Sequence, residues 1–163
     1  MISLPELLES RDRRAARQRE LLAAWPGHTL LCLTVMLPGT VKRSALSLSI
    51  ASAAVSAIHG AFALEFEELR DLETGYEGYF VVAMNPLEAK WLSSSLESEH
   101  PLGRFFDLDV ITKSGPLSRE DYGLPVRRCI ICGKPVRECM RERNHTTEDL
   151  LQKIEEAVRH YRA

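Results

Sequence analysis

Asp107 and Asp109 are the residues of this sequence whose spacing most directly indicates chemistry. They lie in the stretch Gly103–Ile111, where apolar residues such as Phe106 and Leu108 alternate with them. Because side chains of a strand alternate between its two faces, both carboxylates are expected on one face, about 6–7 Å apart. Two carboxylates this close repel each other unless a cation lies between them, and Mg²⁺ is a hard cation that also binds phosphate. The alternative is a pair of acids on the solvated face of an edge strand, since so short a motif is weak evidence.

An arginine-rich helix is expected at the N-terminus, and it could bind a polyphosphate. Arg11, Arg14 and Gln18 have the spacing of one helical face. Guanidinium groups bind phosphate oxygens in two-pronged contacts that an ammonium cannot reproduce. Arg13 and Arg19 fall on other faces of the same helix, and a helix that is merely charged and solvated is the alternative.

Other charged groups flank the aspartate pair or precede expected helices. Lys42 stands just before a helix N-terminus, which favours phosphate, although it could equally be a surface lysine. Arg104 directly precedes the acidic strand, and Arg128 is a further phosphate-binding candidate. Glu97 and His100 are the candidates for the base that removes a proton from an incoming hydroxyl. Glu97 could instead be a third metal ligand, and His100 a loop residue that caps the preceding helix.

The C-terminal part of the sequence carries a cysteine–histidine pattern. Cys129, Cys132, Cys139 and His145 are spaced C-x2-C-x6-C-x5-H. Three thiolates and an imidazole complete a tetrahedron around structural Zn²⁺, and Gly133 permits the tight turn that such a knuckle needs. The alternative is a set of small buried residues in a helical hairpin without metal. A thioredoxin-like redox role is disfavoured because no β-α-β unit begins at this motif.

The elements that must position these residues follow from periodicity and turn residues, and they predict an α+β fold. The predicted order is a helix, then β-α-β-β-α-β, then a tail, which is the ferredoxin-like arrangement of an antiparallel sheet with both core helices on one face. One domain is expected, divided into an N-terminal helix (1–24), an α+β core (25–120) and a Cys/His tail (121–163). The predicted elements are helices at 4–24, 44–64, 86–97 and 146–161, strands at 28–36, 65–72 and 77–84, and the aspartate strand within 103–111.

Composition excludes several classes of function. The chain has 163 residues, 27% of them charged, and a formal net charge of −2, which argues against a protein that coats nucleic acid. No apolar run is long enough to cross a bilayer, and the N-terminus has no signal-peptide pattern. A cytoplasmic protein is expected, in which the four cysteines are thiols or metal ligands rather than disulfides.

Several motifs, taken together, resemble one family along nearly the whole chain. The motifs are Ser10–Arg14 with Arg17 and Gln18, Pro38–Lys42, Glu97 with His100–Arg104, Asp107–Val110, Ser118–Arg119, and Arg127–Cys129 with Cys132, Cys139 and His145. In this order they resemble the apo-citrate-lyase phosphoribosyl-dephospho-CoA transferase family, also called holo-citrate-lyase acyl-carrier-protein synthase. No motif of this family is apparent in residues 62–90.

The resemblance implies an enzyme, its substrates and a role for each residue. The reaction transfers the prosthetic group from triphosphoribosyl-dephospho-CoA to a serine of the acyl carrier subunit of citrate lyase, and pyrophosphate leaves. Asp107 and Asp109 would hold Mg²⁺, the basic residues would bind the phosphates, and Glu97 or His100 would be the base. Two alternatives remain from the residues alone: a zinc-knuckle adaptor for protein or RNA, and a nucleotidyltransferase with a different acceptor. Neither a nucleic acid nor a membrane is expected as a partner.

Overall fold

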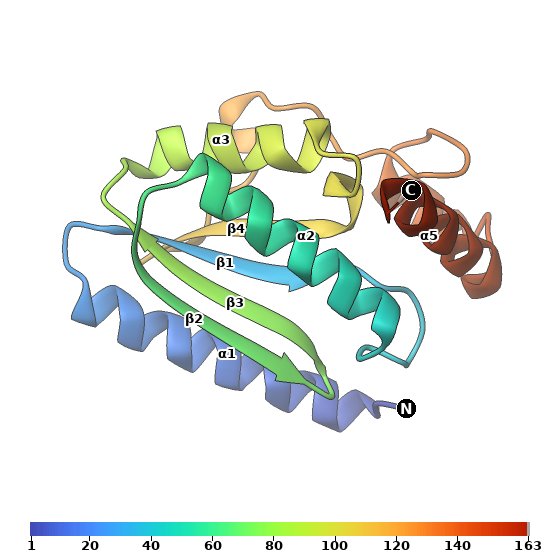
Figure 1. The fold of residues 1–163 in the computed structure, drawn as a ribbon, viewed down its shortest axis with the longest axis horizontal. Coiled ribbons are helices and arrows are strands. Elements are labelled where there is room, and N and C mark those ends of the chain that lie inside the picture. Colours follow the sequence, from blue (N-terminus) through green and yellow to red (C-terminus); the bar gives the residue numbers. More distant parts are fainter. Residues whose placement is uncertain (163) are drawn as a thin grey trace.

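A five-stranded antiparallel sheet forms the centre of the molecule, and helices cover both of its faces (Figure 1). The computed structural model describes residues 1–162. The helices are α1 (Leu4–Ala24), α2 (Ala45–Ala61), α3 (Pro86–Glu99), α4 (Val136–Glu142) and α5 (Thr147–Arg162), with short 3-10 turns η1 (Gly103–Phe105) and η2 (Glu120–Tyr122). The strands are β1 (Thr29–Val35), β2 (Leu64–Leu72), β3 (Gly75–Val82), β4 (Phe106–Thr112) and β5 (Gly115–Pro116).

The strands lie in the order β2-β3-β1-β4-β5, so β1 is central and the aspartate strand β4 is its neighbour. An α+β fold with an antiparallel sheet, an N-terminal helix and a C-terminal Cys/His segment is therefore confirmed. The expected helix and strand positions agree with the structure to within a few residues. Helix α4 lies in the tail, where the sequence indicated no separate helix.

The pairing of β1 with both neighbours aligns two rows of side chains across the sheet. In the first row Thr34 of β1 pairs with Glu77 of β3 and with Asp107 of β4. In the second row Cys32 has Tyr79 and Asp109 as its partners. Because paired residues point to the same face, all six belong to one face of the sheet.

The two faces of the sheet have separate apolar cores. Helices α2 and α3 cover one face, as Figure 1 shows, and α5 packs against the same core through Ile154 and Val158. The opposite face packs against α1, where Leu21 meets Cys32 and Tyr79 in a smaller cluster. The aspartates lie on this second face, which α1 covers. They are therefore not on the open, solvated face of an edge strand, which was the alternative interpretation of the sequence.

Local sequence signals account for the helices that position the site. Ser3 and Glu6 form a capping box at the start of α1, with Pro5 in its first turn. Asn85 caps α3 by accepting hydrogen bonds from two backbone N–H groups, and Pro86 opens that helix. In residues 1–162 no helix is both long and apolar enough to span a membrane.

Candidate active site

A cleft of about 840 Å³ opens at the end of the sheet where β1 ends and β4 begins. Its walls come from the N-terminal half of α1, the loop after β1, the β2–β3 turn, η1 and the tail. These segments lie far apart in the sequence but meet at one end of the sheet (Figure 1). The charged residues that line the cleft are Arg11, Arg14, Lys42, Arg104, Asp107, Arg127, Arg128 and Arg143.

The two aspartates occupy different depths. Asp107 lines the cleft, and the Thr34 hydroxyl donates a hydrogen bond to its Oδ2 atom at 3.3 Å. Asp109 lies two residues further along β4 and is more enclosed. Burial and the neighbouring Asp107 carboxylate raise the pKa of Asp109 to about 6, and Lys90 opposes that shift. Within residues 1–162 neither aspartate has an ion-pair partner, so the pair keeps its mutual repulsion.

Most of the basic residues indicated by the sequence meet in this cleft. Arg11 and Arg14 reach it from α1, Arg104 from η1 and Arg128 from the tail. The Lys42 ammonium donates a hydrogen bond to a backbone carbonyl at 2.6 Å. Burial and, secondarily, the positive charge of Arg11 lower the pKa of Lys42. Several cations gathered in one cleft form a site suited to a polyanion.

The other polar residues of α1 lie outside the cleft. Gln18 is beside Cys32 in the small core, and its side chain partly offsets the burial that raises the pKa of that thiol. Arg17 forms ion pairs with Glu20 and Glu68, and Arg13 pairs with Glu9 at the surface. The expected group of Arg11, Arg14 and Gln18 is therefore divided, with only the two arginines at the cleft.

Glu77 is a charged residue at this site that the sequence analysis missed. It is buried, receives a hydrogen bond from the Tyr79 hydroxyl at 2.7 Å, and pairs with Arg14 at 3.3 Å. Because Tyr79 and Glu77 are fixed in the sheet, they hold the Arg14 guanidinium toward the cleft. The alternation of β3 placed Glu77 on one face, but only the strand order shows that Arg14 faces it.

Glu97 of α3 is buried beside β4 and is not among the residues that line the cleft. One of its oxygens accepts a hydrogen bond from the Leu108 N–H at 2.9 Å, and the Arg127 guanidinium lies 2.8 Å from the same oxygen. Arg119 binds the other oxygen. Both carboxylate oxygens are thus occupied within the protein. Gly103 packs closely against the end of α3, where a Cβ would lie only 2.6 Å from the backbone carbonyl oxygen of Glu97.

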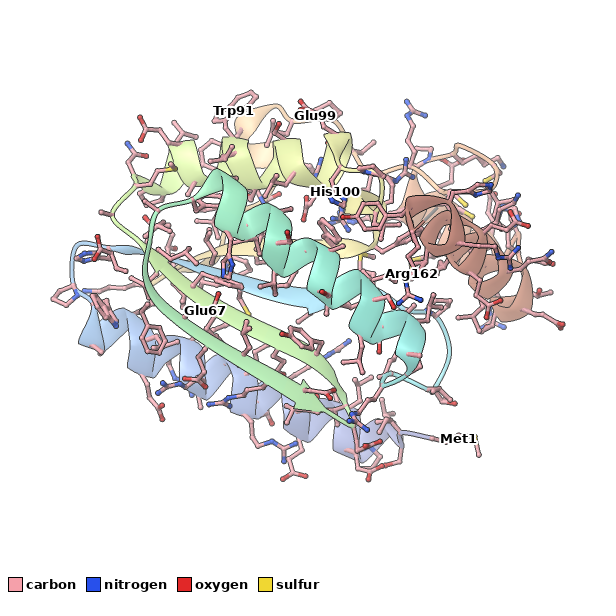
Figure 2. The ribbon with its side chains drawn as sticks, in the orientation of Figure 1. Met1, Glu67, Trp91, Glu99, His100 and Arg162 are labelled. Carbon is pink, nitrogen blue, oxygen red and sulfur yellow. The ribbon has the colours of Figure 1, made fainter. Side chains whose placement is uncertain are left out.

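His100 ends helix α3 and also lies outside the lining of the cleft. Its Nδ1 atom accepts a hydrogen bond from the Leu102 N–H at 3.0 Å. The ring packs between Phe106 and Tyr161, near the C-terminal end of α5 (Figure 2). Burial lowers its pKa. This position matches the alternative of a loop residue that caps the preceding helix.

The cysteines and histidine of the tail form one cluster. The ligand atoms of Cys129, Cys132, Cys139 and His145 all lie within 4.8 Å of one another. The Nε2 atom of His145 is buried and has no hydrogen-bond partner within residues 1–162. Gly133, with a φ of 72°, closes the turn by donating a hydrogen bond to the Cys129 carbonyl at 3.0 Å. The geometry therefore gives a candidate Cys₃His metal site.

One thiol of the cluster is already biased toward the charged form that binds metal. Burial raises the pKa of Cys129, but N–H groups of Cys132 and Ile131 that point at its sulfur outweigh burial and lower that pKa to about 6. The Ile131 nitrogen lies 3.4 Å from the sulfur. Because thiolates and not thiols bind metals, this arrangement favours a cation.

Comparisons with known proteins show the family to which the chain belongs. The family model described as apo-citrate lyase phosphoribosyl-dephospho-CoA transferase matches residues 2–161. The chain belongs to this transferase family. A relative of that name from Escherichia coli is 38% identical over 160 residues, which cover 94% of this chain and 87% of the relative. The relative from Shigella boydii serotype 18 has the same identity and coverage.

Membership in this transferase family confirms the resemblance stated from the sequence motifs. The protein is an enzyme of the class that installs the prosthetic group of citrate lyase. Residues 62–90, in which the sequence showed no family motif, lie inside the matched range and contribute Glu77 to the site. The match therefore spans the elements that build the cleft.

Proposed function

We propose that this protein transfers phosphoribosyl-dephospho-CoA from its triphosphate precursor to a serine of the citrate lyase acyl carrier protein. The serine hydroxyl oxygen attacks the α-phosphorus, the bond from that phosphorus to the β-phosphate oxygen breaks, and pyrophosphate leaves with the bonding electrons. The hydroxyl proton is released. The observation that carries the proposal is the cleft that gathers Asp107 with several cations in a chain matched to this family.

Charge neutralisation on the triphosphate is the main task of such a site, since phosphoryl transfer depends mostly on positioning and electrostatics. Arg11, Arg14, Lys42 and Arg104 are the groups proposed to bind the donor phosphates and the leaving pyrophosphate. Arg128 extends this set from the tail. Gln18 is proposed to position α1 against the sheet, because it lies beside Cys32 and outside the cleft.

The aspartate pair fits a divalent cation such as Mg²⁺. The two carboxylates share one face and lack cationic partners in residues 1–162, and burial together with the Asp107 charge raises the pKa of Asp109. Oxygen ligands of this kind suit Mg²⁺, which usually keeps waters and binds substrate phosphates as well. Asp107 and Asp109 would hold the ion, which would supply positive charge to the phosphates. Thr34 orients the Asp107 carboxylate toward the cleft.

Glu97 and His100 are proposed to stabilise the fold, and not to serve as the general base that the sequence suggested. Glu97 is bound on both oxygens by two arginines and a backbone N–H. His100 is enclosed between two aromatic rings. Neither lines the cleft, so neither is placed to meet an incoming serine.

Zn²⁺ is the metal proposed for the Cys₃His cluster. Thiolate and imidazole ligands in a closed set of four are typical of structural zinc. The buried Nε2 atom of His145 supports this choice, because it has no hydrogen-bond partner among residues 1–162 and buried polar atoms are normally satisfied. Purified protein should carry about one equivalent of zinc.

The fold is proposed to be of the ferredoxin-like kind, with residues 1–163 as one transferase domain. The strand order β2-β3-β1-β4 and the placement of α2 and α3 on one face support it. Helix α1 and strand β5 are additions to that arrangement. A cytoplasmic location, like the absence of nucleic-acid and membrane partners, stays a prediction from the sequence.

The test is to incubate the protein with apo acyl carrier subunit, triphosphoribosyl-dephospho-CoA and Mg²⁺, then weigh the carrier by mass spectrometry. The carrier should gain the mass of one phosphoribosyl-dephospho-CoA group, and one pyrophosphate should appear per group transferred. A carrier in which the acceptor serine is replaced by alanine is the control. An unmodified wild-type carrier with intact donor would contradict the proposal.

A further inference from the structure

The cleft has an apolar lining in addition to its phosphate-binding residues. The cleft volume of about 840 Å³ lies in the upper part of the range of about 300–1,000 Å³ for sites that enclose a drug-sized molecule. A triphosphate alone needs less space than this. Beside its arginines, the tail contributes the apolar side chains Ile130, Val136, Met140, Leu150 and Ile154 to this lining.

Two methionines lie exposed on the walls of the cleft. Met140 of α4 is 70% exposed, and Met36, after β1, is 39% exposed, although both line the cleft. Flexible apolar side chains at the wall of a cleft are typical of binding surfaces that adapt to a ligand. The cleft therefore combines cationic and apolar lining, and a ligand that fills it should have both characters.

The Cys₃His cluster forms part of the same wall. Cys139 and His145 are ligands of the proposed metal and also line the cleft. Cys139 precedes Met140 in α4, and His145 lies two residues before α5. A metal bound by all four residues would tie α4 and the start of α5 to the knuckle at 129–134. Helix α4 has only seven residues, so it gains little stability on its own.

We propose that the tail is the subsite for the dephospho-CoA portion of the donor, and that the Cys₃His metal holds this subsite in place. The proposal rests on the proposed function, because the basic residues of the cleft then bind the triphosphate of the same molecule. Dephospho-CoA supplies the uncharged nucleoside and pantetheine groups that the aliphatic wall can contact. The metal acts through the wall and touches no reacting atom.

The test uses calorimetric titration of the full-length, zinc-loaded protein with two probes, tripolyphosphate and dephospho-CoA. Met140→Ser removes an apolar contact without adding charge, and Leu87→Ser changes an exposed leucine of α3 outside the cleft as a control. Met140→Ser should weaken dephospho-CoA binding about tenfold, as expected for loss of a buried methionine contact, and leave tripolyphosphate binding unchanged. Leu87→Ser should change neither.

Cys132→Ser tests the role of the metal. It should lower the zinc content and weaken dephospho-CoA binding, while tripolyphosphate binds as in the wild type. Competition by adenosine and by pantetheine then shows which part of the coenzyme contacts the wall. Unchanged dephospho-CoA affinity in both variants would overturn the inference, as would an equal loss of affinity for both probes. Failure of the proposed function is distinguished separately, because the wild-type protein would then leave the carrier unmodified in the transfer assay.

Discussion

Glu97, beside β4, and the pair Asp107 and Asp109, on β4, are acids in different surroundings. Glu97 is buried, but Arg119 and Arg127 neutralise it and a backbone N–H satisfies it further. Asp107 and Asp109 are also enclosed, yet within residues 1–162 no cation pairs with them, and the pKa of Asp109 is raised to about 6. Glu97 is paired within the protein, and we propose that the aspartate pair is completed by an added cation.

This difference distinguishes a structural acid from a functional one better than the sequence does. A buried charge is stable only when it is paired, so an enclosed carboxylate pair without a partner indicates a site for an external cation. The raised pKa of Asp109 results from burial and from Asp107, which are the conditions that a divalent ion would relieve. Substitutions and changes of pH can remove the charges by which Glu97 differs from Asp107 and Asp109.

The largest effect is expected for Asp107→Asn and Asp109→Asn. Each should lower prosthetic-group transfer by orders of magnitude, because a lost charged ligand to a catalytic metal removes several kcal/mol of transition-state stabilisation. Thermal stability should stay the same or rise, since the substitution removes repulsion. Transfer is measured by the mass of the carrier, with the exposed Asp121→Asn as control. Near-wild-type transfer by both variants at saturating Mg²⁺ would contradict the assignment.

Glu97→Gln should show the opposite pattern, with the main loss in stability. Arg119 and Arg127 would lose their buried counter-charge, at a cost of about 3–5 kcal/mol in the free energy of unfolding. Chemical denaturation measures this, and Glu142→Gln, at an exposed ion pair with Lys134, should change it by less than about 1 kcal/mol. A stable Glu97→Gln protein that is inactive would instead restore Glu97 as a catalytic residue.

The stability of the metal-free protein should fall as pH rises from about 4 to about 6. In this window folded Asp109 keeps a proton that the unfolded chain has released, because its pKa is about 6 in the fold against 3.8 ordinarily. The loss amounts to about 2–3 kcal/mol above pH 6. The surrounding charges are Asp107 and Glu97, which raise this pKa, and Lys90 and Arg127, which lower it.

Denaturation curves at several pH values measure this effect against the Asp109→Asn variant. The variant should lack the fall that is due to Asp109, and Mg²⁺ should restore stability to the wild type above pH 6 but not below pH 4. Identical pH profiles for the two proteins would show that Asp109 is ionised at its ordinary pKa.

The smallest effects are expected for conservative arginine changes. Arg11→Lys and Arg104→Lys should each weaken donor binding or slow transfer about tenfold, because an ammonium replaces a two-pronged guanidinium contact. Arg13→Lys and Arg19→Lys should be nearly silent, since Arg13 pairs with Glu9 at the surface. Carrier affinity, measured separately, should not change. Equal losses in all four variants would indicate that α1 is a docking surface for the carrier protein.

Much of the fold was predictable because local signals and long-range packing agree. Local sequence signals predicted three elements that the structure contains. They are the capping box of α1, the Asn85-Pro86 start of α3 and the alternation around Asp107 in β4. The Cys₃His cluster was also predictable from spacing, because its ligands are close in the sequence.

The rest depends on contacts between distant segments. Spacing alone could not show that α1 covers the aspartate face, and therefore that Asp109 is enclosed. Nor could it show that Arg14 meets Glu77, or that two arginines from the segment after β5 neutralise Glu97. The assignment of Glu97 as a base followed from its nearness in sequence to the acidic strand. In the fold its carboxylate is bound by the Leu108 N–H and by two arginines, and it does not line the cleft.

Manganese binding, followed by electron paramagnetic resonance at pH 7 with the zinc left in place, tests most directly whether Asp107 and Asp109 bind a divalent cation. Mn²⁺ takes the same oxygen ligands as Mg²⁺ and reports its bound fraction. We expect one Mn²⁺ site in the wild type and in Glu97→Gln. We expect that site to be lost in Asp107→Asn and in Asp109→Asn. Wild-type protein that binds no Mn²⁺, or aspartate variants that bind it as well as the wild type, would contradict the account.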